Sequence, residues 1–489
     1  MKSPWGQWLR KKELIVEYTG IKALIMGLGL HGGGLESARY LASHGAELTI
    51  TDLRDEKALA PSIEELKAAG ISARYVLGRH SMEDFDAADL VIKNPGVRTD
   101  SPYLKAVLDR RSARIETDIS LFLTASPARL IAVTGSKGKS STSSAIHWVL
   151  NQARERGILP GKACLGGNIT VSPLTFLDDL TAEDDVVLEL SSWQLGDLRG
   201  KLRGADPLLK PRAAVLTAIM PDHLDHYGTM EAYVADKRVI YQGQDRGDLT
   251  VAADDSWGRS FLTETPGRPL IYAEKPLPGG VTGGWVESSG GPALARLNSG
   301  ETVELVPARL LVPGYHQKKN CLAAGIALLD LGLPAEFIRE SLGNFPGIGH
   351  RLEFFHENRG IRFYNDTAAT IPEAAAAAVE AFDRPVVLVT GGTDKNLDFG
   401  CLVKAAAKAK ALILLAGTGS EKLRGLLKQA GIPYRGPWDS VDGAVRSALE
   451  TAEAGDVVVL SPGCASFGMF LNEFDRGCRW KEAVLRNGS

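Results

Sequence analysis

The sequence predicts an α/β protein made of three α/β domains in series. Short apolar runs typical of buried strands alternate with helical stretches along most of the chain, a pattern that favours parallel sheets covered by helices. Two glycine-rich segments each stand between a strand and a helix, which is where phosphate-binding loops occur in α/β folds. The length of 489 residues corresponds to about three domains of ordinary size.

The composition is that of a globular protein whose partners are small molecules. Hydrophobic residues make up 44% of the chain and charged residues 24%, which excludes a disordered or fibrous protein. The net charge of -3 provides no basic field, so we expect no nucleic-acid partner. The first segment is too polar for a secretory signal, and no stretch is apolar enough to span a bilayer. We therefore expect a cytoplasmic protein without a membrane partner. We also expect a monomer.

We expect residues 1–116 to form a Rossmann-like first domain, preceded by an extension over residues 1–20. A strand over residues 21–26, a helix ending at Gly45 and a second strand ending at Asp52 make a βαβ unit. The loop after the first strand has the glycine spacing of the dinucleotide fingerprint, in Gly27, Gly29 and Gly32. The pattern alone leaves open NAD, the diphosphate of another nucleotide, or a tight turn without a ligand.

The second domain, expected over residues 117–348, contains the strongest motif in the sequence. The apolar run LIAVTG leads into a glycine-rich loop and then into a helix with one apolar face. Backbone N–H groups and a helix N-terminus in this context bind phosphate oxygens, so we expect a P-loop-type site for ATP or GTP. Lys139 would act as a point charge on the phosphates, and the Ser140 hydroxyl would reach Mg²⁺. The loop residues are Gly135, Ser136, Lys137, Gly138, Lys139 and Ser140.

Further polar residues follow other strands of this domain. Glu189 ends the run VVLEL, and the segment PDHLDHYG follows the run AVLTAI. Ligands gather at the carboxyl ends of such strands, and carboxylate oxygens suit Mg²⁺. Two imidazoles would also suit a transition metal, but no second spaced histidine pair is present, so we favour a Mg²⁺ role for one member of the segment. By spacing alone, Lys237 is an exposed helical lysine, and residues 266–300 are surface loops and hairpins.

The third domain, expected over residues 349–489, is a second Rossmann-like unit. The strand patterns VVLVTGG, ALILLAGTG and DVVVLSPG alternate with helical stretches, which is typical of a parallel sheet. The alanine run that follows Pro372 predicts a helix rather than a linker.

The motifs also occur in a particular order along the chain: GSKGKSS, GGNI, ELSSWQL, PDHLDHYG, YVADKRVIY, GYHQKKN, GHRLE, YNDTAAT, GGTDKNLDF and SPGCASFGMF. This order resembles that of the Mur ligases of peptidoglycan synthesis, over the chain from about Lys22 to Gly477. ELSSWQL and the CASFGMF ending favour the branch of that family that adds D-glutamate to UDP-N-acetylmuramoyl-L-alanine.

The resemblance implies an ATP-dependent amide ligase. The substrate carboxylate would attack the γ-phosphate of ATP to give an acyl phosphate and ADP, and the amine of D-glutamate would then attack the acyl carbon. Positioning and charge neutralisation supply most of such catalysis. The implied catalytic residues are Lys139, Glu189, His223 and Lys237. Two Mg²⁺ ions would lie among Ser140, Glu189, His223 and Lys237, with Lys237 carboxylated to a carbamate.

The resemblance also implies three binding sets. ATP would be held by the loop from Gly135 to Ser140 together with Ser141, Asn320, His350, Arg351 and Asp366. The UDP-linked substrate would contact Leu30, His31, Arg54, Gly96 and Asn168, so that the first-domain fingerprint serves UDP rather than NAD. D-Glutamate would contact Thr370, Lys395, Ser466 and Phe467, with Lys395 paired to a carboxylate. Because these sets lie in different domains, we expect the third domain to close during turnover.

The chain departs from the family pattern in several places. Ala368 replaces a lysine, Gln317 replaces an asparagine, Glu473 and Phe474 are exchanged, and His31 stands where a small hydroxyl residue is common. Alternative functions are another Mur-type ligase with a different amino acid, a folylpolyglutamate synthase, an NAD-dependent dehydrogenase, or a nucleotide-binding regulator without catalysis. The dehydrogenase would leave the second glycine loop unexplained.

Overall fold

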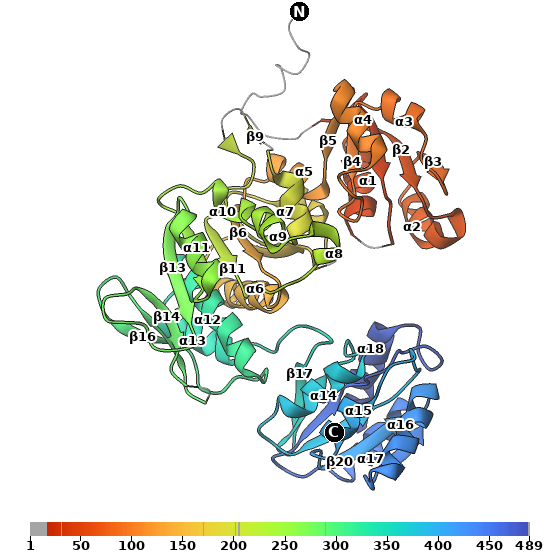
Figure 1. The fold of residues 1–489 in the computed structure, drawn as a ribbon, viewed down its shortest axis with the longest axis vertical. Helices are drawn as coiled ribbons and strands as arrows, with labels where there is room; N and C mark the ends of the chain where they lie inside the picture. Colours follow the sequence, from red (N-terminus) through yellow and green to blue (C-terminus); the bar gives the residue numbers. More distant parts are fainter. Residues whose placement is uncertain are drawn as a thin grey trace, which may run out of the picture. The chain divides into compact units, whose positions relative to one another are not determined.

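The computed structural model describes residues 17–30, 32–169, 171–200, 202–203, 206–288 and 290–487. It confirms the predicted fold class of three α/β domains, each built on its own mostly parallel sheet (Figure 1). The chain packs into two compact units, one up to Trp285 and one from Pro334 onward, with the intervening segment divided between them. Among the described residues, no helix combines the length and the apolar content needed to cross a membrane.

The N-terminal domain has a five-stranded sheet in the order β3-β2-β1-β4-β5, with all neighbours parallel. This order reverses direction between β1 and β4, and ligands of such sheets bind beyond the strand ends at that switch point. The predicted βαβ unit is confirmed as β1, α1 and β2. The elements are β1 Lys22–Met26, α1 Gly33–Ser43, β2 Glu47–Asp52, α2 Glu56–Ala68, β3 Ala73–Leu77, α3 Met82–Ala87, β4 Leu90–Lys93, α4 Pro102–Arg110 and β5 Arg114–Glu116.

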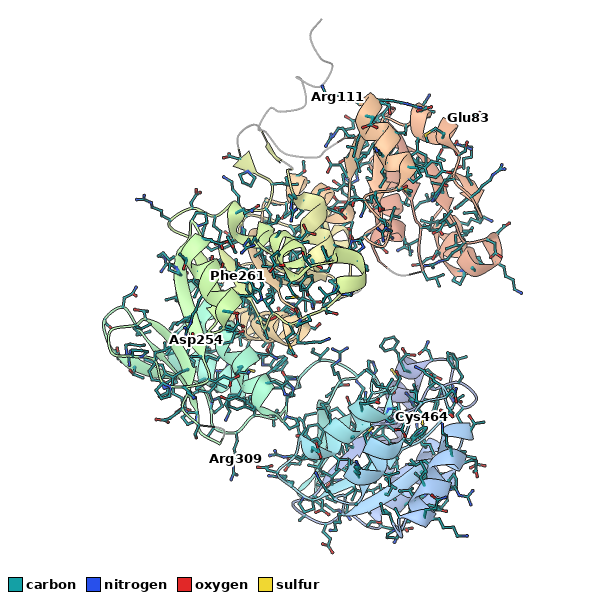
Figure 2. All side chains as sticks on the ribbon, in the orientation of Figure 1. Glu83, Arg111, Asp254, Phe261, Arg309 and Cys464 are labelled. Carbon is teal, nitrogen blue, oxygen red and sulfur yellow. The ribbon has the colours of Figure 1, made fainter. Side chains whose placement is uncertain are left out.

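The central domain has a nine-stranded sheet in the order β16-β15-β14-β13-β12-β11-β6-β8-β7. Its elements up to α9 are α5 Asp118–Ala125, β6 Arg129–Thr134, α6 Lys139–Glu155, β7 Ala163–Gly167, the 3-10 helix η2 Pro173–Asp179, β8 Asp185–Glu189, α7 Ser192–Leu198, β9 Leu202–Arg203, β10 Asp206–Pro207, β11 Ala213–Leu216, α8 Leu224–Tyr227 and α9 Met230–Lys237. They continue with α10 Val239–Gln242, β12 Leu249–Ala253, α11 Ser256–Glu264, β13 Arg268–Ala273, β14 Gly283–Val286, β15 Ala293–Arg296, β16 Thr302–Val306, α12 Tyr315–Asp330 and α13 Ala335–Gly343. Side chains such as Phe261, which is fully buried, fill the space between helices and sheet (Figure 2).

The prediction of surface loops and hairpins over residues 266–300 was wrong for β13, which lies inside the central sheet, and for the buried strand β14. β13 pairs in parallel with both β12 and β14, and Trp285 in β14 is buried. The glycine content was misleading because Gly283 is the first residue of a strand and not part of a loop. Its φ is 149°, and a Cβ there would overlap the Ile271 carbonyl of the neighbouring strand. Glycine in this position marks close backbone approach rather than a loop.

The C-terminal domain has a six-stranded sheet in the order β17-β18-β22-β19-β20-β21, in which β17 is antiparallel to β18 and the other neighbours are parallel. The alanine run forms α14, as predicted. The elements are β17 Glu353–Asn358, β18 Ile361–Asn365, α14 Pro372–Glu380, β19 Val386–Thr390, α15 Gly400–Ala406, β20 Ala411–Leu415, α16 Thr418–Gln429, β21 Arg435–Trp438, α17 Val441–Leu449, β22 Val457–Leu460 and α18 Glu473–Asn487.

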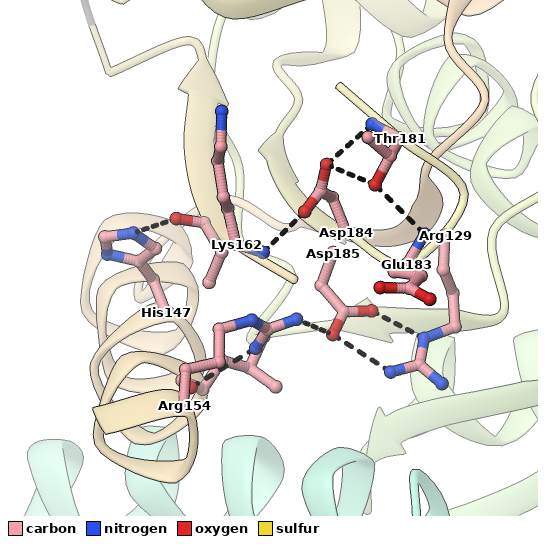
Figure 3. A network of polar contacts seen from close by, with 10 residues as sticks. Arg129, His147, Arg154, Lys162, Thr181, Glu183, Asp184 and Asp185 are labelled. Carbon is pink, nitrogen blue, oxygen red and sulfur yellow. Dashed lines mark hydrogen bonds and ion pairs between the residues drawn. The ribbon is translucent and has the colours of Figure 1, made fainter. Parts of the chain in front are cut away.

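An ionic network around the buried Asp185 connects the amino ends of β6 and β8 (Figure 3). Asp185, which is fully buried, accepts from Arg129 Nε at 2.5 Å and from Arg129 Nη2 at 2.9 Å. Its second oxygen also accepts from Arg154 Nη2 of α6 at 2.5 Å. The carboxylate therefore ties two strands and a helix together at the end of the sheet opposite the glycine loop.

We predict that Asp185→Asn lowers the free energy of unfolding by about 2–4 kcal/mol, because it leaves two guanidinium groups around a site without a counter-charge. Denaturant unfolding monitored by circular dichroism measures the loss. Asp206→Asn is the matched control, since the exposed Asp206–Lys210 pair should contribute less than about 1 kcal/mol. Equal effects of the two substitutions would contradict a structural role for the network.

Candidate active site

The central sheet brings the predicted catalytic segments to one edge. β11, β6, β8 and β7 are neighbours and run parallel, so their carboxyl ends lie side by side. The glycine loop follows β6, Glu189 ends β8, the segment with His223 follows β11, and Asn168 follows β7. Predicted residues from distant parts of the sequence are thereby delivered to the same edge.

The glycine loop is shaped by close backbone packing. Gly135 has a φ of 150°, and a Cβ there would overlap the Thr217 hydroxyl group, so only glycine fits. Thr217 Oγ1 donates to the Lys137 carbonyl oxygen at 2.7 Å. Gly138, with a φ of 93°, ends the loop as the N-cap of α6. The loop thus leads into a helix N-terminus, the arrangement that favours a phosphate group.

Ser136 anchors this loop to the rest of the domain. Its hydroxyl group donates to the Met220 carbonyl oxygen at 2.9 Å and accepts from the Met220 N–H at 3.0 Å. The Tyr233 hydroxyl oxygen lies 2.9 Å from Ser136 Oγ. Tyr233 was missed in the sequence. Its position four residues before Lys237 is the signal that could have found it, because that spacing puts both side chains on one helix face.

Lys139, the predicted phosphate lysine, folds back onto its own loop. Its Nζ donates to the carbonyl oxygens of Gly135 at 3.0 Å and Ser136 at 3.1 Å. Burial is the main cause that lowers the pKa of Lys139. An anionic phosphate oxygen would be a stronger partner for this ammonium group than two neutral carbonyl oxygens.

Glu189 is a buried carboxylate with one oxygen left without a partner. Its side chain is 1% exposed, and Oε1 accepts from Asn168 Nδ2 at 2.9 Å. Among the residues that the structure describes, Oε2 has no hydrogen-bond partner. A buried carboxylate oxygen without a donor is costly unless a cation or a ligand meets it. Two predicted site residues, Glu189 and Asn168, are therefore brought into direct contact.

Lys237 is buried, so its interpretation as an exposed helical lysine was wrong. The residue is 1% exposed, and Nζ donates to the Gly135 carbonyl oxygen at 2.9 Å. It also lies 4.6 Å from the centre of the Tyr233 ring, within the range of a cation–π contact. Burial, followed by the neighbouring Lys139 cation, lowers the pKa of Lys237 to about 7. The ε-amine can therefore be neutral near physiological pH.

His223 lies at an exposed bend between β11 and α8. It is the N-cap of α8 with a left-handed φ of 53°, a conformation that is uncommon for a residue with a side chain and that often marks a functional site. Its ring centre lies 5.2 Å from that of Trp193 in α7. Within the described residues, no group of three His, Cys, Asp or Glu side chains gathers closely enough to hold a metal ion.

The predicted UDP residues of the first domain follow β1, β2 and β4. Leu30 is an exposed apolar side chain in the loop after β1, while His31 lies outside the described residues. Asp52, at the end of β2, accepts from the Gly29 N–H at 3.3 Å and from the Arg54 N–H at 2.9 Å. This carboxylate therefore shapes the loop instead of standing free for a ribose hydroxyl group, which weighs against the NAD alternative.

In the C-terminal domain the predicted D-glutamate residues also follow neighbouring strands. β18, β22 and β19 are adjacent and parallel, and they precede Thr370, Ser466 and Lys395 respectively. Backbone hydrogen bonds of 3.0 Å in each direction between Thr393 and Ala465 join the loops that carry Lys395 and Ser466. Ser466 is buried, and the adjacent Phe467 is 64% exposed.

The remaining predicted ATP residues lie in α12 and at the start of the C-terminal domain. Asn320 belongs to α12, and Arg351 is an exposed residue just before β17. His350 has a left-handed φ of 66°, and its backbone N–H donates to Glu353 Oε2 at 2.9 Å. Asp366 accepts from the Leu352 N–H at 3.0 Å and from Ser461 Oγ at 2.6 Å, and burial raises its pKa to about 6.

The fold and the central loop define an α/β protein with a phosphate-type loop at the carboxyl edge of its middle sheet. The description "Mur ligase MurD-like, N-terminal domain" matches residues 21–115, "Mur ligase middle domain" matches residues 133–328, and "Mur ligase, glutamate ligase domain" matches residues 350–464. The chain belongs to the Mur ligase family.

Several curated relatives align along nearly their whole length. The UDP-N-acetylmuramoylalanine--D-glutamate ligase of Treponema pallidum (strain Nichols) is 41% identical, with 95% of this chain and 97% of the relative covered. The ligases of the same name from Roseiflexus sp. (strain RS-1) and Borreliella afzelii (strain PKo) are 38% and 37% identical, each with 96% of this chain covered and 99% and 98% of the relative.

Solved structures share the fold. The UDP-N-acetylmuramate-alanine ligase MurC of Thermotoga maritima aligns with a TM-score of 0.54 at 19% identity, covering 96% of this chain and 100% of the other. MurF of Acinetobacter baumannii aligns with a TM-score of 0.53 at 14% identity, covering 95% of this chain and 93% of the other.

In the predicted ATP site, Asp366 accepts a hydrogen bond from the nucleotide. We therefore predict that the affinity for the nucleotide depends on the protonation of Asp366. Its carboxyl group is ionised only above a pKa of about 6, so ADP should bind about tenfold more weakly at pH 5 than at pH 7.5 through this residue. Calorimetry measures the change, and Asp366→Asn corrects for protonation of the nucleotide itself. A pH dependence that is the same in both proteins would contradict this role.

Proposed function

We propose that this protein is an ATP-dependent ligase that adds D-glutamate to UDP-N-acetylmuramoyl-L-alanine in peptidoglycan precursor synthesis. Relatives that carry this activity in their names are 37–41% identical along nearly the whole chain. The observation in the structure that carries the proposal is the buried contact of Lys237 with the glycine loop, Nζ to Gly135 O at 2.9 Å. A lysine kept at a depressed pKa beside a phosphate-type loop is unusual as a purely structural feature.

The proposed reaction divides into two steps. The alanyl carboxylate attacks the γ-phosphorus of ATP, the bond to the β-phosphate oxygen breaks, and an acyl phosphate and ADP form. The deprotonated amine of D-glutamate then attacks the acyl carbon, and inorganic phosphate leaves. Lys139 would exchange its two carbonyl partners for phosphate oxygens, and the N–H groups at the start of α6 would neutralise further charge. These contributions are electrostatic and need a fixed geometry.

The residues at this edge fit Mg²⁺. Glu189 Oε2 is a buried carboxylate oxygen that accepts from no donor in the described part of the chain, and oxygen ligands of this kind suit the ion. When bound, Mg²⁺ would neutralise charge on the transferring phosphoryl group. Ser140 and His223 would complete the set together with Lys237, once that lysine carries a carboxylate.

Carboxylation of Lys237 would supply the missing oxygen ligand. The neutral ε-amine attacks CO₂, a carbon–nitrogen bond forms, and one proton is released, so that a cation becomes an anionic carbamate. The pKa of about 7 makes the nucleophilic amine available near neutral pH, whereas an ordinary lysine with a pKa near 10.4 would be almost wholly protonated.

We predict that ¹³C-labelled bicarbonate gives a carbamate signal at pH 8 that falls as the pH drops below about 7, where the neutral amine decreases about tenfold per unit. Nuclear magnetic resonance of the nucleotide-free protein measures it. Lys237→Met should abolish the signal, and the exposed Lys395→Met should retain it. A signal that survives in Lys237→Met would place the carbamate elsewhere.

The acceptor and nucleotide sets are proposed to meet by closure of the C-terminal domain. Thr370, Lys395, Ser466 and Phe467 would hold D-glutamate, and Asn320, His350, Arg351 and Asp366 would complete the ATP site begun by the glycine loop. Leu30, His31, Arg54, Gly96 and Asn168 would hold the UDP-linked substrate. Domain bounds at residues 116 and 348, a monomeric state and a cytoplasmic location, where ATP is available, belong to the same proposal.

The acceptor amino acid distinguishes this proposal from that of another Mur-type ligase. Phosphate release is measured with ATP, Mg²⁺ and UDP-N-acetylmuramoyl-L-alanine, and with D-glutamate, L-glutamate, L-lysine or meso-diaminopimelate as the amine. We expect turnover only with D-glutamate, because relatives that are 37–41% identical have this amino acid in their names. Lys395 and the buried Ser466 would provide polar groups for its carboxylates. Turnover with a different amine would reassign the specificity. Turnover with none, in folded protein that binds ATP, would favour a regulator.

A further inference from the structure

Helix α7 joins the proposed catalytic carboxylate to the N-terminal domain. It begins shortly after Glu189, with Ser191 as its N-cap in a capping box with Gln194. Near its other end, Asp197 forms an ion pair with Lys93, Oδ2 to Nζ at 2.7 Å, in which each side chain is 5% exposed. Lys93 is the last residue of β4, so this buried pair connects the first sheet to a helix of the second domain.

On its N-terminal side, the pair adjoins the loop proposed to hold UDP. Asn94, the residue after Lys93, donates to the Gly27 carbonyl oxygen at 3.2 Å and accepts from the Gly96 N–H at 3.0 Å. The loop after β4 is thereby tied to the glycine loop after β1. A shift of Lys93 would move the two loops together as one unit, without changing their position relative to each other.

Within the central domain, α7 packs against α9, the helix that carries Lys237. Gly196 lies so close to Asp236 that a Cβ at position 196 would be 2.5 Å from Asp236 Oδ2. Arg199 forms an ion pair with the same carboxylate, and Asp236 directly precedes Lys237. A movement of α7 would therefore shift Glu189, which lies just before the helix, and would shift Lys237 through the contact with α9.

These groups surround one cavity of about 440 Å³. Its lining includes Lys93, Gly96, Trp193, Asp197, His226 and Asp236. The indole N–H of Trp193 is buried, and no described residue forms a hydrogen bond with it. The cavity thus extends from the proposed UDP loop to the aromatic side chain that faces His223, and the ion pair forms part of its wall.

We propose that Lys93 and Asp197 are positioning residues that set the spacing between the UDP-holding loop and the catalytic edge. The inference rests on the proposed function, because that spacing matters only for a substrate with a nucleotide at one end and a reacting carboxylate at the other. A buried ion pair adds little net stability but can select one arrangement over others. Binding at two points gains affinity only when the spacing of the sites matches the ligand.

The test compares the affinity for UDP with the affinity for UDP-N-acetylmuramoyl-L-alanine, both measured by calorimetry on the full chain. The ratio of the two dissociation constants reports the gain from the second binding point. The variants are the apolar pair Lys93→Met/Asp197→Leu and the charge-swapped pair Lys93→Asp/Asp197→Lys. The exposed pair Lys210 and Asp206 has the same residue types, so Lys210→Met/Asp206→Leu is the matched control.

In the apolar variant we expect the ratio of the two dissociation constants to fall about tenfold or more. We expect the same variant to stay folded in thermal unfolding and to keep its affinity for UDP alone. The charge-swapped pair should recover much of the ratio, and the control should leave it unchanged. An apolar pair that keeps the full ratio would show that Lys93 and Asp197 serve only packing, and would overturn the inference. A wild-type protein that gains nothing from the acyl sugar would instead overturn the proposed function.

Discussion

In the central sheet, β6 pairs in parallel with β11 on one side and with β8 on the other, with Thr134 opposite Leu216 and Val133 opposite Glu189. This register places the glycine loop between the segment that carries His223 and the buried Glu189. A slip of β8 by one residue would turn the Glu189 side chain to the opposite face of the sheet. The positive φ of Gly135 and the hydroxyl group of Thr217 depend on the same alignment, because both lie where β6 and β11 end. Strand order and register therefore bring the residues of the candidate site together, and no single side chain does so.

A second constraint is the burial of Lys237. An ammonium group inside a protein is destabilising unless it is paired or neutralised, and its partners here are the Gly135 carbonyl oxygen and the face of Tyr233. The same burial lowers the pKa to about 7 and makes the amine nucleophilic. Burial of this lysine thus lowers the stability of the fold and at the same time favours the proposed carboxylation. Such a loss of stability is expected at a functional site.

The parts of the fold that could be predicted from sequence have continuous apolar runs beside glycine punctuation, as in β6, β8 and β19. β13 and β14 were not predicted, because the glycine-rich composition of the segment indicated loops. Gly283 instead allows two strands to approach closely, and local composition cannot distinguish these two roles of glycine. The burial of Lys237 could not be predicted from spacing, since it depends on α9 packing near the loop at the end of β6. The Lys93–Asp197 pair joins residues 104 positions apart, and no local pattern links them. The roles assigned by resemblance to Asn320, Arg351 and Lys395 stay predictions, although the strand order explains why several such residues follow neighbouring strands.

We propose that the loop at Gly135 serves to make an acyl phosphate on the substrate carboxylate. The most direct measurement uses UDP-N-acetylmuramoyl-L-alanine labelled with ¹⁸O in its alanyl carboxylate, together with ATP and D-glutamate. Mass spectrometry of the inorganic phosphate follows the label. We expect one ¹⁸O atom in each phosphate released, because the carboxylate oxygen that attacks the γ-phosphorus leaves with it. Unlabelled phosphate formed together with the ligated product would show that no acyl phosphate forms on this carboxylate.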